Sequence, residues 1–184
     1  MTVQLLFVQG AGKGTHDQWD NKLAESLAGE LGAGYSIHYP RMPNEDDPRY
    51  NAWKAALIDE CKSFHDGAIL AGHSFGGAIL LHVLAEERFT FRPRALILIA
   101  APFIGAGGWQ SDDIAALTDL AERLPARLHV FLYHGTEDES VPFAHAQLYA
   151  QAIPDAVLRA VPHGDHQLNN DLSAVAQDIR SLAA

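Results

Sequence analysis

The pentapeptide Gly-His-Ser-Phe-Gly at 72–76 lies between an apolar run at 68–71 and an apolar segment with helical spacing. A strand, a Gly-x-Ser-x-Gly turn and a helix are together typical of a nucleophile elbow, which exposes its serine on a sharp turn. Such a turn leaves no room for side chains two positions before and after the serine, and glycine occupies both positions. The turn would lift the hydroxyl of Ser74 off the carboxyl edge of a sheet and place the N–H of Phe75 where an oxyanion forms. The pattern predicts a serine nucleophile; the alternative is a glycine-rich connection without a chemical role.

A serine hydroxyl needs a general base near neutral pH, and the base needs an acidic partner that fixes its tautomer. After a nucleophile elbow, the acid is expected behind a later strand and the histidine behind the last one. The segment HGTEDES at 134–140 follows an apolar run and contains Asp138, which we predict to be the acid. Its neighbours Glu137 and Glu139 are typical solvated charges, although an acid shifted by one position is an alternative.

Two histidines follow the last apolar run, in the segment PHGDHQLNN at 162–170. His166 lies farther along this loop, from where its side chain can reach back over Ser74, so we predict it to be the base. His163 is the alternative, and His73, inside the elbow, is expected to pack or to support loops. The chain has no His-Glu-x-x-His pattern and its other histidines are scattered, so neither a metal site nor a cofactor is predicted.

The second oxyanion donor is expected in the loop after the first apolar run. Small residues in the segment QGAG at 9–12 let backbone amides approach a substrate oxygen closely. We predict the N–H of Ala11 as this donor. Gly12 is the near alternative and a candidate substrate-binding residue.

Two other loops are expected at the same edge of the sheet. The loop at 101–111 carries three bulky apolar side chains that either line a substrate pocket or only hold a long loop on the surface: Phe103, Ile104 and Trp109. The acidic, proline-containing loop at 40–49 is expected to be solvated.

Apolar runs that alternate with helical segments set the expected architecture. Six runs have strand character, at 3–8, 35–39, 68–71, 95–100, 128–133 and 156–161. Six segments have helical periodicity, at 18–31, 50–64, 76–87, 112–124, 143–153 and 172–182. Because this alternation is typical of parallel sheets covered on both faces, we predict a three-layer α/β/α sandwich around a six-stranded parallel sheet, in a single domain over 1–184. The carboxyl ends of all strands then meet at one edge, where ligands bind.

The composition excludes several classes of protein. A net charge of -10 argues against nucleic-acid binding and gives no attraction to anionic membranes. The single cysteine, Cys61, excludes an intrachain disulfide and a cysteine-built zinc site. The first ten residues contain no basic stretch and only a short apolar run, which favours a strand over a signal peptide. We therefore expect a cytoplasmic protein that meets a small-molecule substrate; the sequence does not indicate an oligomeric state.

Taken together, these residues resemble the α/β-hydrolase superfamily. The matching pieces are QGAG at 9–12, GHSFG at 72–76, HGTED at 134–138 with Val141-Pro142, and GDH at 164–166. The resemblance implies Ser74 as nucleophile, Asp138 as acid and His166 as base, in a minimal fold without a cap domain.

Within that superfamily, the chain is most similar to the small lidless serine hydrolases of the retinoblastoma-binding-protein (YdeN-like) group. These proteins share the short length and a Met-Pro loop like Met42-Pro43. One departure is Gln9, which stands where the superfamily usually has histidine. The resemblance implies a carboxylesterase-like serine hydrolase acting on a small ester, thioester or amide.

Two other functions are considered. The segment GAGKGT at 10–15 looks like a phosphate-binding loop, but the first glycine of that motif would fall on Phe7 and its Ser/Thr position is Gly14, which argues against a nucleotide kinase. A non-catalytic binding or scaffold protein on a hydrolase fold is the other alternative, because a fold alone does not imply activity.

Overall fold

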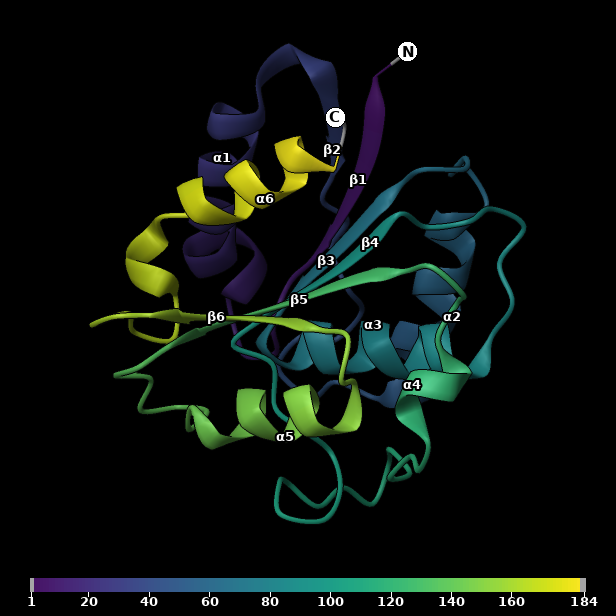
Figure 1. Ribbon diagram of the computed structural model, residues 1–184, viewed down its shortest axis with the longest axis vertical. Helices are drawn as coiled ribbons and strands as arrows, with labels where there is room; N and C mark the ends of the chain where they lie inside the picture. Colours follow the sequence, from purple (N-terminus) through teal and green to yellow (C-terminus); the bar gives the residue numbers. More distant parts are fainter. Residues whose placement is uncertain (1, 183–184) are drawn as a thin grey trace.

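The computed structural model describes residues 2–182. Six strands form one sheet in the order β2-β1-β3-β4-β5-β6 (Figure 1). They are β1 (Val3–Val8), β2 (Tyr35–His38), β3 (Ile69–His73), β4 (Ala95–Ile99), β5 (His129–Gly135) and β6 (Val157–Val161). Every pair of neighbouring strands is parallel, so all carboxyl ends lie at one edge. The predicted six-stranded parallel sheet is confirmed.

Helices cover both faces of this sheet. They are α1 (Asp20–Leu31), α2 (Tyr50–Cys61), α3 (Ser74–Glu86), α4 (Leu120–Arg123), α5 (Ala144–Ala152) and α6 (Ser173–Ser181). Figure 1 shows α1 and α6 on one face, with α2, α3, α4 and α5 on the other. The predicted three-layer sandwich is therefore confirmed, and residues 2–182 contain no inserted cap domain.

The fully buried strand β4 shows how the sequence builds these layers. Side chains along a strand alternate between the two faces of a sheet. Accordingly, Leu96 and Leu98 belong to the core cluster formed with α2 and α3. Ile97 and Ile99 belong to the separate cluster formed with α1 and α6. A strand with apolar residues at every position is needed because both of its faces are covered.

One predicted helix, 112–124, is wrong over most of its length, since only Leu120–Arg123 is helical. The hydroxyl of Ser111 accepts hydrogen bonds from the backbone N–H groups of Asp113 and Ile114, which favours a turn over a helix. Asp119, directly before α4, adopts a left-handed conformation with φ of 56°, which a continuous helix does not allow. The side chain of Ile114 is buried in the core. The apolar spacing of the segment 112–124 therefore reflects packing and does not require a helix.

The order of the strands places two loops next to each other. The chain passes from β1 to β2 on one side and returns to β3 on the other side of β1. The loops after β1 and β3 therefore leave adjacent strands in opposite directions, which is the position where open α/β sheets bind their ligands. These are the loops that carry the segment at 9–12 and Ser74. Separately, no helix within the described residues is long and apolar enough to cross a membrane.

His82 in α3 gives a first testable prediction. Its side chain is buried, its Nδ1 has no hydrogen-bond partner, and burial lowers its pKa from 6.5 to about 4. Since the unfolded chain binds this proton at a higher pH than the folded chain, the folded state loses stability as the pH falls from about 6.5 to about 4. The difference of about 2.5 pKa units corresponds to about 3 kcal/mol. At pH 7.5 we expect the free energy of unfolding of His82→Leu to be at least as large as that of the wild type. At pH 4.5 the difference in favour of His82→Leu should be about 2–3 kcal/mol larger than at pH 7.5.

Urea unfolding of both proteins at several pH values measures this difference. Other groups that titrate in this range contribute equally to both proteins and cancel. A stability difference that does not change between pH 7.5 and 4.5 would show that His82 is already protonated, or solvated, in the folded state.

Candidate active site

Ser74 is the first residue of α3 and follows directly on β3. Its φ of 51° lies in the left-handed region, which a residue other than glycine adopts only when its surroundings impose it. The glycines of the elbow allow this turn: a Cβ on Gly72 would lie 2.6 Å from the Cα of Gly77. A Cβ on Gly76 would overlap the backbone carbonyl of Gln9. The predicted strand–turn–helix context of Ser74 is present in the structure.

Asp138 lies in the loop after β5, and its carboxyl group is fully buried. Its Oδ1 accepts the backbone N–H groups of Ser140 and Val141, each at 2.8 Å. Its Oδ2 lies 2.8 Å from Nδ1 of His166 and 3.2 Å from Nε2 of His134. Burial alone would raise the pKa of the Asp138 carboxyl, but the hydrogen bonds from both histidines and from Val141 hold this pKa well below its usual range. Asp138 is therefore an anion at neutral pH.

His166 joins Asp138 to Ser74. Its Nε2 lies 3.0 Å from Oγ of Ser74, while its Nδ1 faces Asp138 as described. Its loop is held close to β5, because the N–H of Glu137 donates to the carbonyl of Gly164 at 3.0 Å. A Cβ on Gly135, the last residue of β5, would overlap this same carbonyl group. Two glycines thus let the loop of the histidine approach the loop of the acid.

The alternatives to these residues lie elsewhere. The side chain of His163 is 86% exposed and its Nδ1 lies 2.6 Å from a carboxylate oxygen of Glu137, which is itself 62% exposed. These two side chains form an ion pair on the surface when the histidine is protonated. The carboxylate that lies 2.8 Å from Nδ1 of His166 belongs to Asp138 and not to Glu139. The structure brings Ser74, His166 and Asp138 together and leaves the alternatives outside this group.

The structure bears on the two backbone amides that are candidates for binding an oxyanion. The N–H of Phe75 belongs to the first turn of α3, where helical N–H groups have no carbonyl partner within the helix. On the other side, Gly10 lies against Ser74, since a Cβ on this glycine would be 3.1 Å from the Cβ of Ser74. The N–H of Gly12 already donates to the backbone carbonyl of Glu45 at 2.6 Å. This contact favours Ala11 over Gly12 as the second donor.

Every residue of the loop at 40–49 except Met42 is exposed or half-buried, as predicted, but Glu45 also holds this loop against the loop after β1. Its carboxylate is only 13% exposed and accepts the backbone N–H groups of Gly14 and His16, at 2.8 and 2.9 Å. It also accepts the side-chain amide of Gln9, whose carbonyl oxygen in turn accepts the N–H of Met42. Gln9 therefore links the loop after β1 to the Met-Pro loop.

The three apolar residues predicted to bind substrate lie in the loop after β4, and they differ in their surroundings. Ile104 is buried and packs in the core cluster of α2 and α3, so it anchors the loop. Phe103 is half-buried, and its N–H donates to Nδ1 of the buried His145 at 2.9 Å. Trp109 is 41% exposed, with its ring 5.6 Å from that of His145. Phe103 and Trp109 stay candidates for contact with a substrate.

A polar network next to the candidate site contains Asp20, His73 and Gln167. The sequence predicts only one part of this network, the supporting role of His73. His73 was expected to support loops, and the structure places its Nδ1 2.8 Å from Oδ2 of Asp20 and its Nε2 2.9 Å from the backbone carbonyl of His166. Asp20, the first residue of α1, also accepts the N–H of Gly10 at 2.7 Å and the side-chain amide of Gln167 at 3.0 Å. Asp20 belongs to no sequence motif. Its only sequence signal is that an acidic residue stands among the buried positions of α1.

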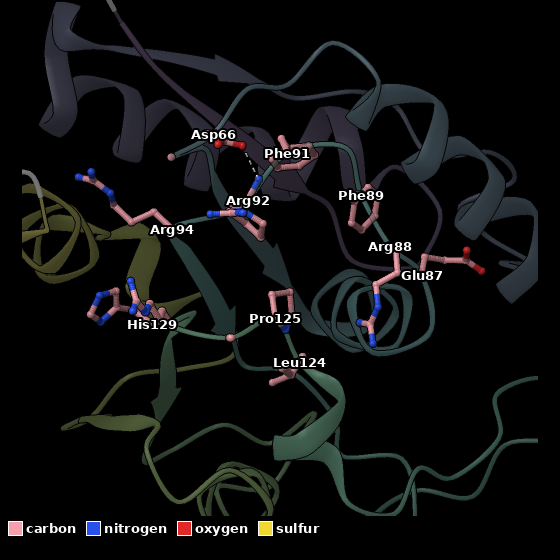
Figure 2. Close-up of a pocket in the computed structure, with 14 residues that line it drawn as sticks. Asp66, Glu87, Arg88, Phe89, Phe91, Arg92, Arg94, Leu124, Pro125 and His129 are labelled. Atoms are coloured by element: carbon pink, nitrogen blue, oxygen red, sulfur yellow. Dashed lines mark hydrogen bonds between the residues drawn. The ribbon is translucent and has the colours of Figure 1, made fainter.

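A broad cleft with a volume of about 950 Å³ lies at the opposite, amino-terminal edge of the sheet, where the segments before β3, β4 and β5 meet (Figure 2). Its lining includes four arginines and His129, the first residue of β5: Arg88, Arg92, Arg94 and Arg127. Neither Ser74 nor His166 contributes to it, so it is separate from the candidate active site. Among residues 2–182, no group of three or more His, Cys, Asp or Glu side chains is arranged to hold a metal ion.

Comparison with known proteins adds a family and a fold. A family model described as alpha/beta hydrolase family matches residues 5–133. The structure of the ydeN gene product from B. subtilis is 23% identical, with 99% of both chains covered and a TM-score of 0.75. The esterase domain of a Rhodothermus marinus protein is 20% identical, covering 98% of this chain and 86% of that one with a TM-score of 0.71.

A third solved structure is that of a protein described as having no lid. A member of the a/b serine hydrolases without a lid, from Xanthomonas campestris, is 19% identical, covering 98% of this chain and 80% of that one with a TM-score of 0.66. At these identities the likeness to the three structures shows the fold. No curated protein sequence matches this chain significantly.

Proposed function

Because this chain belongs to the alpha/beta hydrolase family, we propose that it is a serine hydrolase that cleaves a small ester, thioester or amide through an acyl-enzyme on Ser74. The observation that carries this proposal is a continuous chain of hydrogen bonds from a buried carboxylate to a serine hydroxyl. It runs from Asp138 to Nδ1 of His166 at 2.8 Å and from Nε2 of His166 to Oγ of Ser74 at 3.0 Å. Esterases and serine hydrolases among the solved structures with this fold support the same reaction class.

The first half of the reaction follows from the protonation of His166. Because Nδ1–H donates to the carboxylate of Asp138, the lone pair of Nε2 faces the hydroxyl of Ser74. As Oγ attacks the substrate carbonyl, its proton passes to Nε2, and Asp138 stabilises the resulting imidazolium. The N–H groups of Phe75 and Ala11 hold the oxyanion of the tetrahedral intermediate. His166 then gives the proton to the leaving alcohol, thiol or amine, and the acyl group stays on Oγ.

The second half repeats these steps with water. Nε2 of His166 takes a proton from a water molecule, whose oxygen attacks the acyl-enzyme carbonyl. When the tetrahedral intermediate collapses, the proton returns to Oγ of Ser74 and the carboxylic acid leaves. We propose that Phe103 and Trp109 contact the acyl or alcohol part of the substrate. Because residues 2–182 contain no inserted cap domain, we expect small or flexible substrates.

A nucleotide kinase is not supported by the loop that resembles a phosphate-binding motif. The backbone N–H groups of Gly14 and His16, which would face a phosphate, are occupied by the carboxylate of Glu45. A second anion at this position would be repelled by that carboxylate.

Covalent labelling with a fluorophosphonate probe tests the proposal and separates it from a non-catalytic scaffold. We expect a single adduct on the peptide that contains Ser74, with labelling slowed by p-nitrophenyl acetate as a competing substrate. A panel of p-nitrophenyl esters with increasing acyl length then defines the preferred substrate size. If no adduct forms on Ser74 and no ester of the panel is cleaved, the chain is a scaffold and the proposal fails.

A further inference from the structure

The protonation of His73 follows from what surrounds its ring. Both ring nitrogens face oxygens that accept hydrogen bonds: Nδ1 faces the carboxylate of Asp20, and Nε2 faces the backbone carbonyl of His166. A carbonyl oxygen has no proton to give, so Nε2 must carry one. With a single proton on Nε2, the lone pair of Nδ1 would face a carboxylate oxygen at 2.8 Å. A neutral ring therefore satisfies only one of these two contacts.

The alternative place for the second proton is Asp20 itself, and the structure disfavours it. Its Oδ2 accepts the N–H of Gly10, and its Oδ1 accepts the side-chain amide of Gln167. Together with Nδ1 of His73, three donors point at this carboxylate, as expected for an anion. Burial by itself would raise the pKa of Asp20 and lower that of His73, but their attraction and these hydrogen bonds move both pKa values the other way. Asp20 and His73 are thus a buried ion pair.

This pair connects three segments of the active site. Asp20 holds Gly10, the residue before the oxyanion donor Ala11. His73 is the residue before Ser74, and it holds His166 by the backbone carbonyl of that residue. Asp20 also holds Gln167, the residue after the base. Each contact lies on a residue of the proposed mechanism or on its neighbour in the chain, so the ion pair can fix the relative positions of nucleophile, base and oxyanion loop.

We propose that Asp20 and His73 form a second, permanently charged Asp–His pair that positions Ser74, His166 and Ala11 without touching the substrate. Its effect on catalysis rests on the proposed function, whereas the charge of His73 does not. The charged or titratable groups around His73 are Asp20 from α1, His166 with its ring centroid 4.8 Å away, and Asp138 beyond that ring. Tyr39, after β2, donates its hydroxyl to the backbone carbonyl of His16, and burial and then the charge of Asp20 raise its pKa so that it is neutral.

Nuclear magnetic resonance of the histidine side chains tests the charge. The sample is the ¹⁵N-histidine-labelled Ser74→Ala protein, so the result does not depend on catalysis by Ser74. The signals of His73 are assigned by their loss in His73→Gln. We expect both ring nitrogens to be protonated, with shifts that stay constant from pH 5.5 to 8.5. A ring with one N–H in this range would overturn the proposal.

Kinetics with Asp20→Asn test the positioning role. This variant keeps the size of the side chain and removes its charge. We expect kcat for p-nitrophenyl esters, and the rate of fluorophosphonate labelling, to fall by about 10–100-fold while KM changes by less than about twofold. The matched control is Asp178→Asn, which removes a carboxylate of α6 that accepts hydrogen bonds from Tyr133 and Arg159 and should leave kcat within about twofold.

The outcomes separate the two proposals. A wild-type protein that neither hydrolyses esters nor reacts with the probe contradicts the proposed function, and the resonance experiment then still decides the charge of His73. An active wild type with Asp20→Asn as active as Asp178→Asn contradicts the positioning role alone. If Asp20→Asn does not fold, His73→Gln replaces it, with the same expected fall in kcat and the same control.

Discussion

Replacing Ser74 by alanine is expected to lower kcat for p-nitrophenyl esters by about 10⁴–10⁶-fold, the largest effect of any single change in this chain. In the proposed mechanism the hydroxyl is the group that forms the covalent bond, and its oxygen lies 3.0 Å from Nε2 of His166. His166→Ala should cost nearly as much, since Ser74 then has no base. The double variant Ser74→Ala/His166→Ala should be little worse than either single variant, because the two residues act as one unit.

Steady-state kinetics of the three variants, with unfolding curves to show that each is folded, check this prediction. His163→Ala is the matched control for the histidine, because its ring is 86% exposed and its Nδ1 pairs with Glu137, and it should keep kcat within about twofold. Multiplicative losses in the double variant would show that Ser74 and His166 act independently. Near-full activity of Ser74→Ala would remove the serine mechanism altogether.

Most of the fold could be predicted because its signals are local. The buried strands of a parallel sheet are continuous apolar runs, and β4 with five buried residues is the clearest example. The helix predicted at 112–124 failed because its apolar spacing reflects a loop that buries Ile114 against the core. Periodicity reports which residues are buried, and it does not distinguish a helix from an irregular segment that buries the same positions.

The residues of the candidate site that the structure brings together could be predicted only where a residue stands in a motif or in a fixed chain order. Ser74 follows from its glycines, and Asp138 and His166 follow from the strands that precede them. Asp20 and Glu45 have no such signal, because their roles come from backbone N–H groups contributed by distant segments. Glu45 lies 31 residues from Gly14, whose amide it accepts, and only the paired strands β1 and β2 bring the two together. Residues that hold loops by accepting backbone amides are therefore the part of an active site that a sequence reveals last.

Gly76→Ala is expected to have the second-largest effect, on stability and activity together. The added Cβ would overlap the backbone carbonyl of Gln9 and lie 3.0 Å from a methyl group of Val8. The backbone carbonyl of Gln9 cannot move away as a flexible side chain could. Gln9 directly follows β1, and its side chain is hydrogen-bonded to Met42 and Glu45. Either α3 or the end of β1 must move. We expect a loss of about 3 kcal/mol or more in the free energy of unfolding, equivalent to roughly 6–12 °C in Tm for a chain of this size.

The same displacement separates the two halves of the proposed oxyanion hole. Phe75 is carried by α3 and Ala11 by the loop after β1, so a shift between these elements widens the gap between their N–H groups. We therefore expect kcat at 25 °C to fall by about 10–100-fold in the protein that remains folded, while KM changes little. Gly29→Ala is the matched control: this glycine lies inside α1 with no atom within 4 Å of an added Cβ, so alanine should raise stability by about 0.5–1 kcal/mol. Thermal unfolding and ester kinetics of both variants test this prediction. If Gly76→Ala unfolds at the same Tm as the wild type, Gly76 does not pack against the carbonyl of Gln9 as in this structure.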